Sequence, residues 1–147
     1  MRVLFIINSM SFGGAEKQVF DLLLGLKKKG VQVFLITLVK PTAFIEELKK
    51  NDINHYCINL KQKNKKNIIF HFVAFLNLFF VIKKFNPEII HSHLFHSNMY
   101  GRVVSFFLNA KNISTVHSLV EYGKFRPILY RFTNWLCSKM VFVSEVS

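Results

Sequence analysis

The chain has 147 residues and a mass of 17.2 kDa, the size of a single folded domain. Hydrophobic residues make up 51% of it and charged residues 19%, which excludes a disordered or fibrous protein. Its two cysteines, expected to be reduced thiols, exclude a disulfide scaffold and a four-cysteine zinc site. The formal net charge of +12 favours anionic partners: phosphates, anionic lipids or nucleic acid.

Strand and helix patterns alternate along the whole chain. In chain order the predicted elements are a strand at 2–8, a helix at 15–29, a strand at 31–39, a helix at 44–51, a strand at 53–60, a polar loop at 61–67, a helix at 68–85, a strand at 88–93, a helix at 97–108, a strand at 112–117, a helix from Pro127 to about Ser138 and a strand at 140–144. This alternation predicts a single α/β domain over residues 1–147, a Rossmann-like doubly wound parallel sheet of about six strands. The seventeen phenylalanines predict a core of large aromatic side chains.

The most apolar segment is 68–82, where 13 of 15 residues are apolar. Lysine pairs precede and follow it, at Lys65–Lys66 and Lys83–Lys84. A bilayer-spanning helix needs about 20 apolar residues, so a buried or membrane-facing helix is favoured over a transmembrane one. Because each basic residue near an anionic membrane adds about 1 kcal/mol, the flanking lysines favour contact with an anionic membrane surface.

The first predicted strand leads into the segment Ser-Met-Ser-Phe-Gly-Gly-Ala-Glu at residues 9–16. Ligands of doubly wound sheets bind at the carboxyl ends of the strands, where this segment lies. Gly13 and Gly14 would let the backbone approach a ligand, with the first amides of the next helix facing a phosphate. The alternative is that the pair only makes a tight turn. The segment matches neither G-x-G-x-x-G nor a P-loop, which disfavours a dehydrogenase or an ATPase.

Histidines cluster in the later strands. His91 and His93 share one face of a predicted strand, His96 follows it and His117 ends the next strand, so His93, His96 and His117 could converge on one cleft. No Cys, Asp or Glu lies beside them, so no metal is expected. His117 could act as an acid, a base or a polar ligand, or have a structural role. Nucleic acid is not expected as a partner, because the chain has no basic recognition helix or aromatic-studded recognition strand.

Five segments together suggest a family: R-V-L-F-I-I, then S-F-G-G-A-E, P-E-I-I-H-S-H, S-T-V-H-S and V-F-V-S. In this order and spacing the chain resembles the N-terminal, acceptor-side domain of glycosyltransferase family 4. The family consists of retaining, nucleotide-sugar-dependent transferases of the GT-B fold, so the resemblance implies one half of such a fold. It covers essentially all 147 residues.

The resemblance also implies site residues. The substrate-binding residues that it implies are Gly13, Gly14, Glu16, His93 and Ser144. The two glycines match the family's loop against the donor diphosphate and the acceptor. His117 matches the histidine that lines the transfer site and is the implied catalytic residue.

The remaining implications concern partners. The resemblance implies a lipid-linked or glycan acceptor in cell-surface polysaccharide or lipopolysaccharide synthesis, and a cytoplasmic protein peripheral on the inner face of the membrane. It implies no cofactor, with a nucleotide-diphosphate sugar as donor substrate. That donor is gripped by a second domain outside these 147 residues, so the isolated chain is expected to bind weakly and not to turn over. The alternatives are a non-catalytic membrane-associated module, a degenerate or split enzyme fragment, and a generic nucleotide-binding Rossmann protein.

Overall fold

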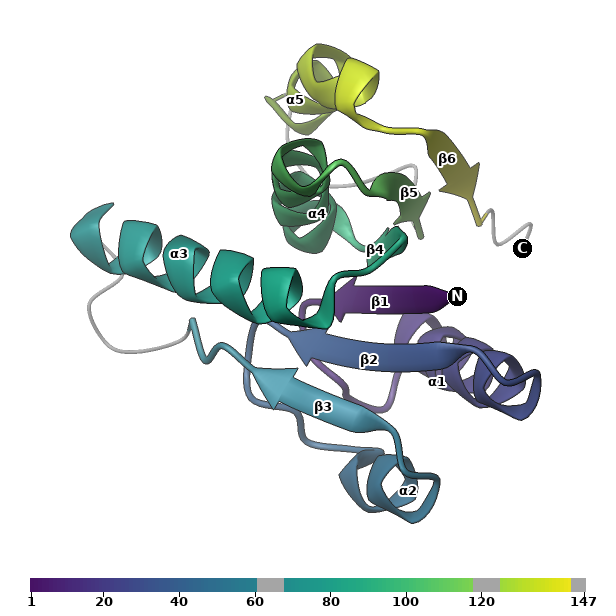
Figure 1. The fold of residues 1–147 in the computed structure, drawn as a ribbon. Coiled ribbons are helices and arrows are strands. Elements are labelled where there is room, and N and C mark those ends of the chain that lie inside the picture. Colours follow the sequence, from purple (N-terminus) through teal and green to yellow (C-terminus); the bar gives the residue numbers. More distant parts are fainter. Residues whose placement is uncertain (61–67, 118–124, 144–147) are drawn as a thin grey trace.

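The computed structural model describes residues 1–60, 68–117 and 125–143, and within them six parallel strands form one sheet (Figure 1). The strands are β1 (Arg2–Ile7), β2 (Gln32–Thr37), β3 (Asn54–Cys57), β4 (Ile89–His93), β5 (Lys111–Val116) and β6 (Lys139–Phe142), in the order β3-β2-β1-β4-β5-β6. The helices are α1 (Gly14–Lys28), α2 (Ile45–Lys50), α3 (Ile68–Phe85), α4 (Phe95–Leu108), α5 (Phe125–Thr133) and a 3₁₀ turn, η1 (Asn134–Leu136). The predicted doubly wound α/β fold is confirmed.

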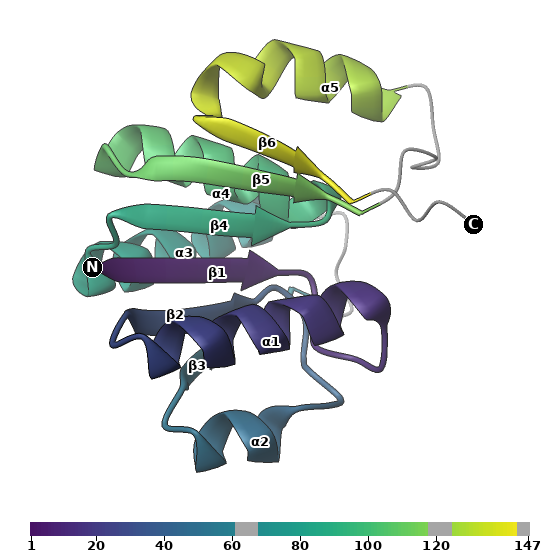
Figure 2. The same cartoon turned by 90° about the vertical axis from the view of Figure 1, so that its right-hand side faces the viewer.

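The strand order reverses at β1, which lies between β2 and β4. Val3 pairs with Val33 of β2 on one side and with Ile89 of β4 on the other. Figure 2 shows α1 and α2 in front of the sheet and α3 and α4 behind it. Because ligands of such sheets bind where the order reverses, the carboxyl ends of β1 and β4 mark the expected site.

Two hydrophobic cores lie on the two faces of the sheet, and β1 contributes to both. Phe5 and Ile7 pack with α1, whereas Leu4 and Ile6 pack with α3 and α4. This alternation explains why β1 is apolar at every position after Arg2, from Val3 to Ile7, rather than at every second one. The fully buried core is mainly aliphatic: of the phenylalanines described, the buried ones are Phe5 and Phe20. Other phenylalanines, such as Phe34 and Phe44, pack against the two cores while partly exposed, so the predicted aromatic core is confirmed only at its margin.

Two helices differ from their predicted bounds by two residues or more. The helix predicted at 97–108 begins two residues earlier, at Phe95. The helix predicted at 127–138 begins at Phe125, and after Thr133 it tightens into η1. Pro127 is therefore the third helical residue rather than the first, a place that still needs no backbone donor because first-turn amides have no intrahelical partner.

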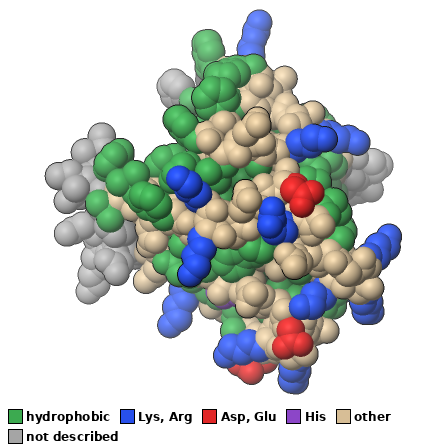
Figure 3. Space-filling view, in the orientation of Figure 1, with side chains coloured by type: hydrophobic (Ala, Val, Ile, Leu, Met, Phe, Trp, Pro, Cys, Tyr) green, Lys and Arg blue, Asp and Glu red, His purple; other side chains and the backbone are tan. Residues whose placement is uncertain are grey.

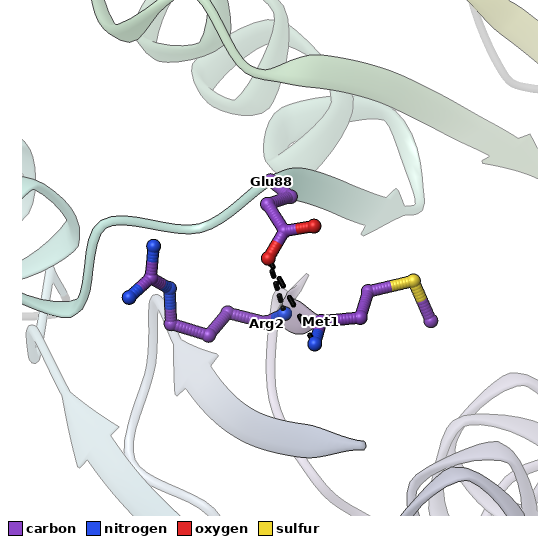
Figure 4. A network of polar contacts seen from close by, with 3 residues as sticks. All are labelled: Met1, Arg2 and Glu88. Atoms are coloured by element: carbon purple, nitrogen blue, oxygen red, sulfur yellow. Dashed lines mark hydrogen bonds and ion pairs between the residues drawn. The ribbon is translucent and has the colours of Figure 1, made fainter.

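Glu88 lies at the amino edge of the sheet, opposite the expected site, where it contacts the start of β1. Its carboxylate accepts a hydrogen bond from the Arg2 backbone amide at 3.2 Å and lies 3.9 Å from the Met1 amino group (Figure 4). These contacts join the starts of β1 and β4. They stabilise the strand pair whose other ends carry the candidate site.

Candidate active site

Two histidines meet at the carboxyl edge of the sheet. His93 is the last residue of β4 and His117 follows β5 directly, so the parallel register brings them together. His93 Nδ1 and His117 Nε2 lie 3.0 Å apart, a hydrogen-bonding distance. The His91 ring lies 4.2 Å from that of His93, and its Nε2 is 2.8 Å from the Thr115 hydroxyl. The site therefore contains a layer of three imidazoles, of which the sequence predicted His93 and His117.

Burial decides the charge of these rings. His93 is 1% exposed, and desolvation, assisted by the neighbouring histidines, lowers its pKa to about 2. Desolvation, with a smaller contribution from His117, lowers the pKa of His91 to about 4. Both rings are neutral at neutral pH, and His93 Nε2 is buried without a hydrogen-bond partner among the described residues. Since two neutral rings share one proton across the His93–His117 contact, each ring fixes the tautomer of the other.

His117 is only partly buried and faces two opposing influences. Desolvation lowers its pKa, whereas the carboxylate of Glu16 raises it, and the net pKa is below the usual value. Glu16 lies in the first turn of α1, and its carboxylate accepts a hydrogen bond of 2.8 Å from Ser11 Oγ. The glycine segment after β1 and the histidine after β5 therefore interact electrostatically across the carboxyl edge.

At Gly13 the glycine segment has a backbone conformation that any residue can adopt. Gly13 is the residue before α1 and has an extended backbone, with φ −149° and ψ 164°. A Cβ at this position would collide with the carboxylate of Glu16, so the absence of a side chain makes room for that carboxylate. Gly14 is the first residue of α1, and Gly13 offers no side-chain cap to this helix end. The first amides of α1 therefore face the same edge as Glu16.

A strained residue follows His93. Leu94 has φ 70° and ψ 158°, a backbone conformation that residues other than glycine rarely adopt. Its amide donates to the Thr115 carbonyl at 3.2 Å, and its side chain packs against the α1 core. This conformation turns the chain abruptly from β4 into α4, directly beside the histidine pair.

Buried polar side chains beneath the histidines were missed by the sequence analysis. Ser97 Oγ donates to Asn8 Oδ1 at 3.2 Å, which joins α4 to the end of β1. Asn98 is fully buried, and its amide donates to the Thr115 carbonyl and to the Tyr130 hydroxyl, both at 3.0 Å. Polar residues on the side of α4 that repeats at helical spacing, Asn98, Arg102 and Ser105, are the signal that would have identified them.

The other predicted residues have different outcomes. His96 is exposed in the first turn of α4, where burial and the charge of Arg126 lower its pKa, so it belongs to the α4–α5 side rather than to the histidine pair. Ser144 lies outside the described residues. Within the described ranges, no group of three or more His, Cys, Asp or Glu side chains is arranged to hold a metal ion. In the same ranges no helix is long and apolar enough to cross a bilayer.

The family model for Glycosyltransferase Family 4 matches residues 12–147 of this sequence. The chain belongs to glycosyltransferase family 4. No curated protein sequence matches this family 4 chain. The matched range contains Gly13, Gly14, Glu16, His93 and His117, that is, every predicted site residue that the structure describes.

Solved structures give the fold of this family 4 chain independently. HepE (Alr3699) of Anabaena, crystallised with UDP and glucose, matches with a TM-score of 0.75 and 14% identity over 95% of this chain and 37% of its own. A glycosyltransferase from Rickettsia africae matches with a TM-score of 0.74 and 21% identity, over 97% of this chain and 36% of its own. MurG of Acinetobacter baumannii matches with a TM-score of 0.72 and 13% identity, over 99% of this chain and 42% of its own. The chain thus has the fold of one half of a GT-B glycosyltransferase and spans little more than a third of these structures' length.

Proposed function

We propose that residues 1–147 form the acceptor-side half of a retaining sugar transferase that acts in cell-surface glycan synthesis. The donor is a nucleotide-diphosphate sugar, held mainly by a second Rossmann-like domain, and no resident cofactor is needed. The acceptor is a lipid-linked sugar or a growing glycan. The observation that carries the proposal is the 3.0 Å contact between His93 and His117 at the carboxyl edge of the sheet, with the charge of Glu16 acting on His117, in a chain of family 4.

Each side chain has a distinct part in this proposal. Gly13 and Gly14 bring backbone amides close to the donor phosphates, where the positive end of α1 favours negative charge. His117, partly exposed and uncharged at neutral pH, offers its second ring nitrogen to the reacting sugar and is the proposed catalytic residue. His93 holds the ring of His117 through the 3.0 Å contact. Ser144 remains a proposed binding residue on the strength of the family motif alone.

The test is a transfer assay with the full gene product, a panel of radiolabelled nucleotide sugars that includes UDP-glucose, and membranes of the source organism as acceptor. Label should enter the lipid-extractable or glycan fraction. His117→Ala should slow transfer at least about 100-fold, a usual effect of losing a positioned acid–base group. His55→Gln is the matched control, because His55 lies on β3 and bonds to Thr37 at 3.0 Å. Transfer that survives His117→Ala would remove the proposed catalytic role.

A membrane-associated module without catalysis is the second candidate, favoured by the exposed phenylalanines of α3 and α4. In this candidate the protein sits peripherally on the inner face of the cytoplasmic membrane and binds a partner chain. Vesicle binding without transfer from any nucleotide sugar, by a preparation that contains a donor domain, would favour it over the transferase.

A further inference from the structure

Five aromatic side chains form a continuous row across three elements on the outside of the α3–α4 layer. This aromatic band consists of Phe79 and Phe80 of α3, Phe106 and Phe107 of α4, and Trp135 of η1. Successive ring centroids are 5.9 Å (Phe79–Phe80), 6.5 Å (Phe79–Phe107), 5.6 Å (Phe106–Phe107) and 5.5 Å (Phe106–Trp135) apart. The band joins residues that lie more than fifty positions apart in the sequence.

The band faces outward. Phe80 is 60% exposed, Phe106 57%, Phe107 64% and Trp135 71%, whereas Phe79 packs partly against the core beneath. Along α3 the exposed surface continues through Val73 and Leu76 at helical spacing. Single exposed apolar residues are ordinary, but a contiguous apolar surface of this kind marks an interaction site.

Charge around the band identifies the chemistry of its partner. Lys83 and Lys84 follow Phe80 by three and four residues, so they lie on the same side of α3. The sequences of α3, α4, α5 and η1 contain no Asp or Glu at all. The acidic residues of the first two helices, Glu16, Asp21, Glu46 and Glu47, lie instead on the opposite face of the sheet. Figure 3 shows hydrophobic side chains gathered over α3 with Lys and Arg beside them.

We propose that the aromatic band is the surface by which this domain docks on an anionic phospholipid bilayer, with Trp135, Phe106 and Phe107 entering the interface and Lys83 and Lys84 contacting lipid phosphates. Tryptophan rings and basic side chains together are the combination that binds the headgroup region. This inference deepens the membrane part of the proposed function by naming the face and the residues. It does not require transfer activity.

The chain carries its own reporter, because Trp135 is its one tryptophan. The 147-residue chain is mixed with vesicles of phosphatidylcholine alone or of phosphatidylcholine with phosphatidylglycerol, and sedimentation and tryptophan emission are recorded. We expect co-sedimentation with the anionic vesicles, weakened by salt, together with a blue shift of Trp135 emission and quenching by brominated lipid. No co-sedimentation by the folded chain at low salt, or binding without a change in Trp135 emission, would overturn the proposal.

Matched variants distinguish vesicle binding by the aromatic band from nonspecific binding by other surfaces of the protein. Lys83→Ala/Lys84→Ala should weaken partitioning about fivefold for each lysine removed, whereas Lys28→Ala/Lys29→Ala, an exposed pair at the end of α1, should leave it unchanged. Phe106→Ser/Phe107→Ser should weaken partitioning about tenfold for each phenylalanine, and Leu22→Ser on α1 should not. Equal losses in the control variants would overturn the proposal.

The main competing occupant is a second copy of the chain. Sedimentation velocity without lipid distinguishes it: a concentration-dependent dimer that Phe106→Ser/Phe107→Ser converts to a monomer would assign the band to self-association and overturn the membrane proposal. Since neither assay contains a sugar nucleotide, their failure leaves the transferase proposal untouched, and failure of transfer leaves vesicle binding to be judged by itself.

Discussion

Helices α1 and α3 cover opposite faces of the same sheet, yet they are built differently. α1 buries Val19, Phe20 and Leu23 and turns polar side chains outward, among them the ion pair of Lys17 with Asp21. α3 buries Leu78 and Ile82 against the sheet and also exposes large apolar side chains such as Phe80. The fold needs one apolar stripe from each helix, so the outer apolar side of α3 is not explained by folding of the described domain.

The comparison predicts that the two sides of the molecule respond differently to loss of an apolar side chain. Leu23→Ala on the buried side of α1 should lower the free energy of unfolding by about 2–5 kcal/mol, because it leaves a cavity. Phe80→Ala on the outer side of α3 should change it by less than about 1 kcal/mol. Urea denaturation measures both. Equal losses would mean that the outer side of α3 is packed after all.

Two glycine substitutions compare a packed position on α4 with an open position on α1. A Cβ on Gly101 of α4 would lie 2.9 Å from Ser92 Cβ of β4, so Gly101→Ala should destabilise the protein by about 1–3 kcal/mol. A Cβ on Gly25 of α1 would meet nothing within 4 Å, so Gly25→Ala should stabilise by up to about 1 kcal/mol through helix propensity. Thermal unfolding of the pair should shift in opposite directions, and a shared direction would contradict the packing described.

Acid should lower the stability of the protein through its buried histidines, His91 and His93. The pKa of His91 is about 4 and that of His93 about 2, whereas unfolding returns both to 6.5. The unfolded state then binds more protons below pH 6.5, so stability is complete above that pH and is lost as pH falls toward 4, by about 1.4 kcal/mol per pH unit for each histidine. His91→Gln should remove one histidine's share of this slope. An unchanged slope between pH 6 and 5 would contradict the buried, neutral state of His91.

The smallest expected effect tests the link from α1 to the histidines. Glu16→Gln removes the carboxylate that raises the pKa of His117, so that pKa should fall, with stability changed by less than about 0.5 kcal/mol. NMR titration of the His117 ring protons measures it. Asp21→Asn, farther along α1 and exposed, is the control. If both variants leave the pKa of His117 unchanged, Glu16 does not act on this ring.

The site was partly predictable from the sequence because parallel strands end at one edge. That rule brought His93 and His117 together correctly, and His91 correctly onto the face of His93. It gave the wrong place for His96, because the direction of that side chain depends on where α4 begins. The strained conformation of Leu94 starts α4 at Phe95, and no sequence pattern announces such a turn in a residue other than glycine.

The sequence by itself determined the layered α/β architecture. Its short apolar strands alternate with helices, and right-handed crossover connections leave few other arrangements. Only the tertiary structure decided which phenylalanines are buried. A helix that has large apolar residues on both its inner and its outer side, such as α3, has little periodicity to mark its inner face, so its orientation depends on how Leu78 and Ile82 fit against the sheet. That fit turns Phe80 outward and sets Phe79 beside Phe107, which in turn adjoins Phe106 and Trp135, and thereby creates the aromatic band.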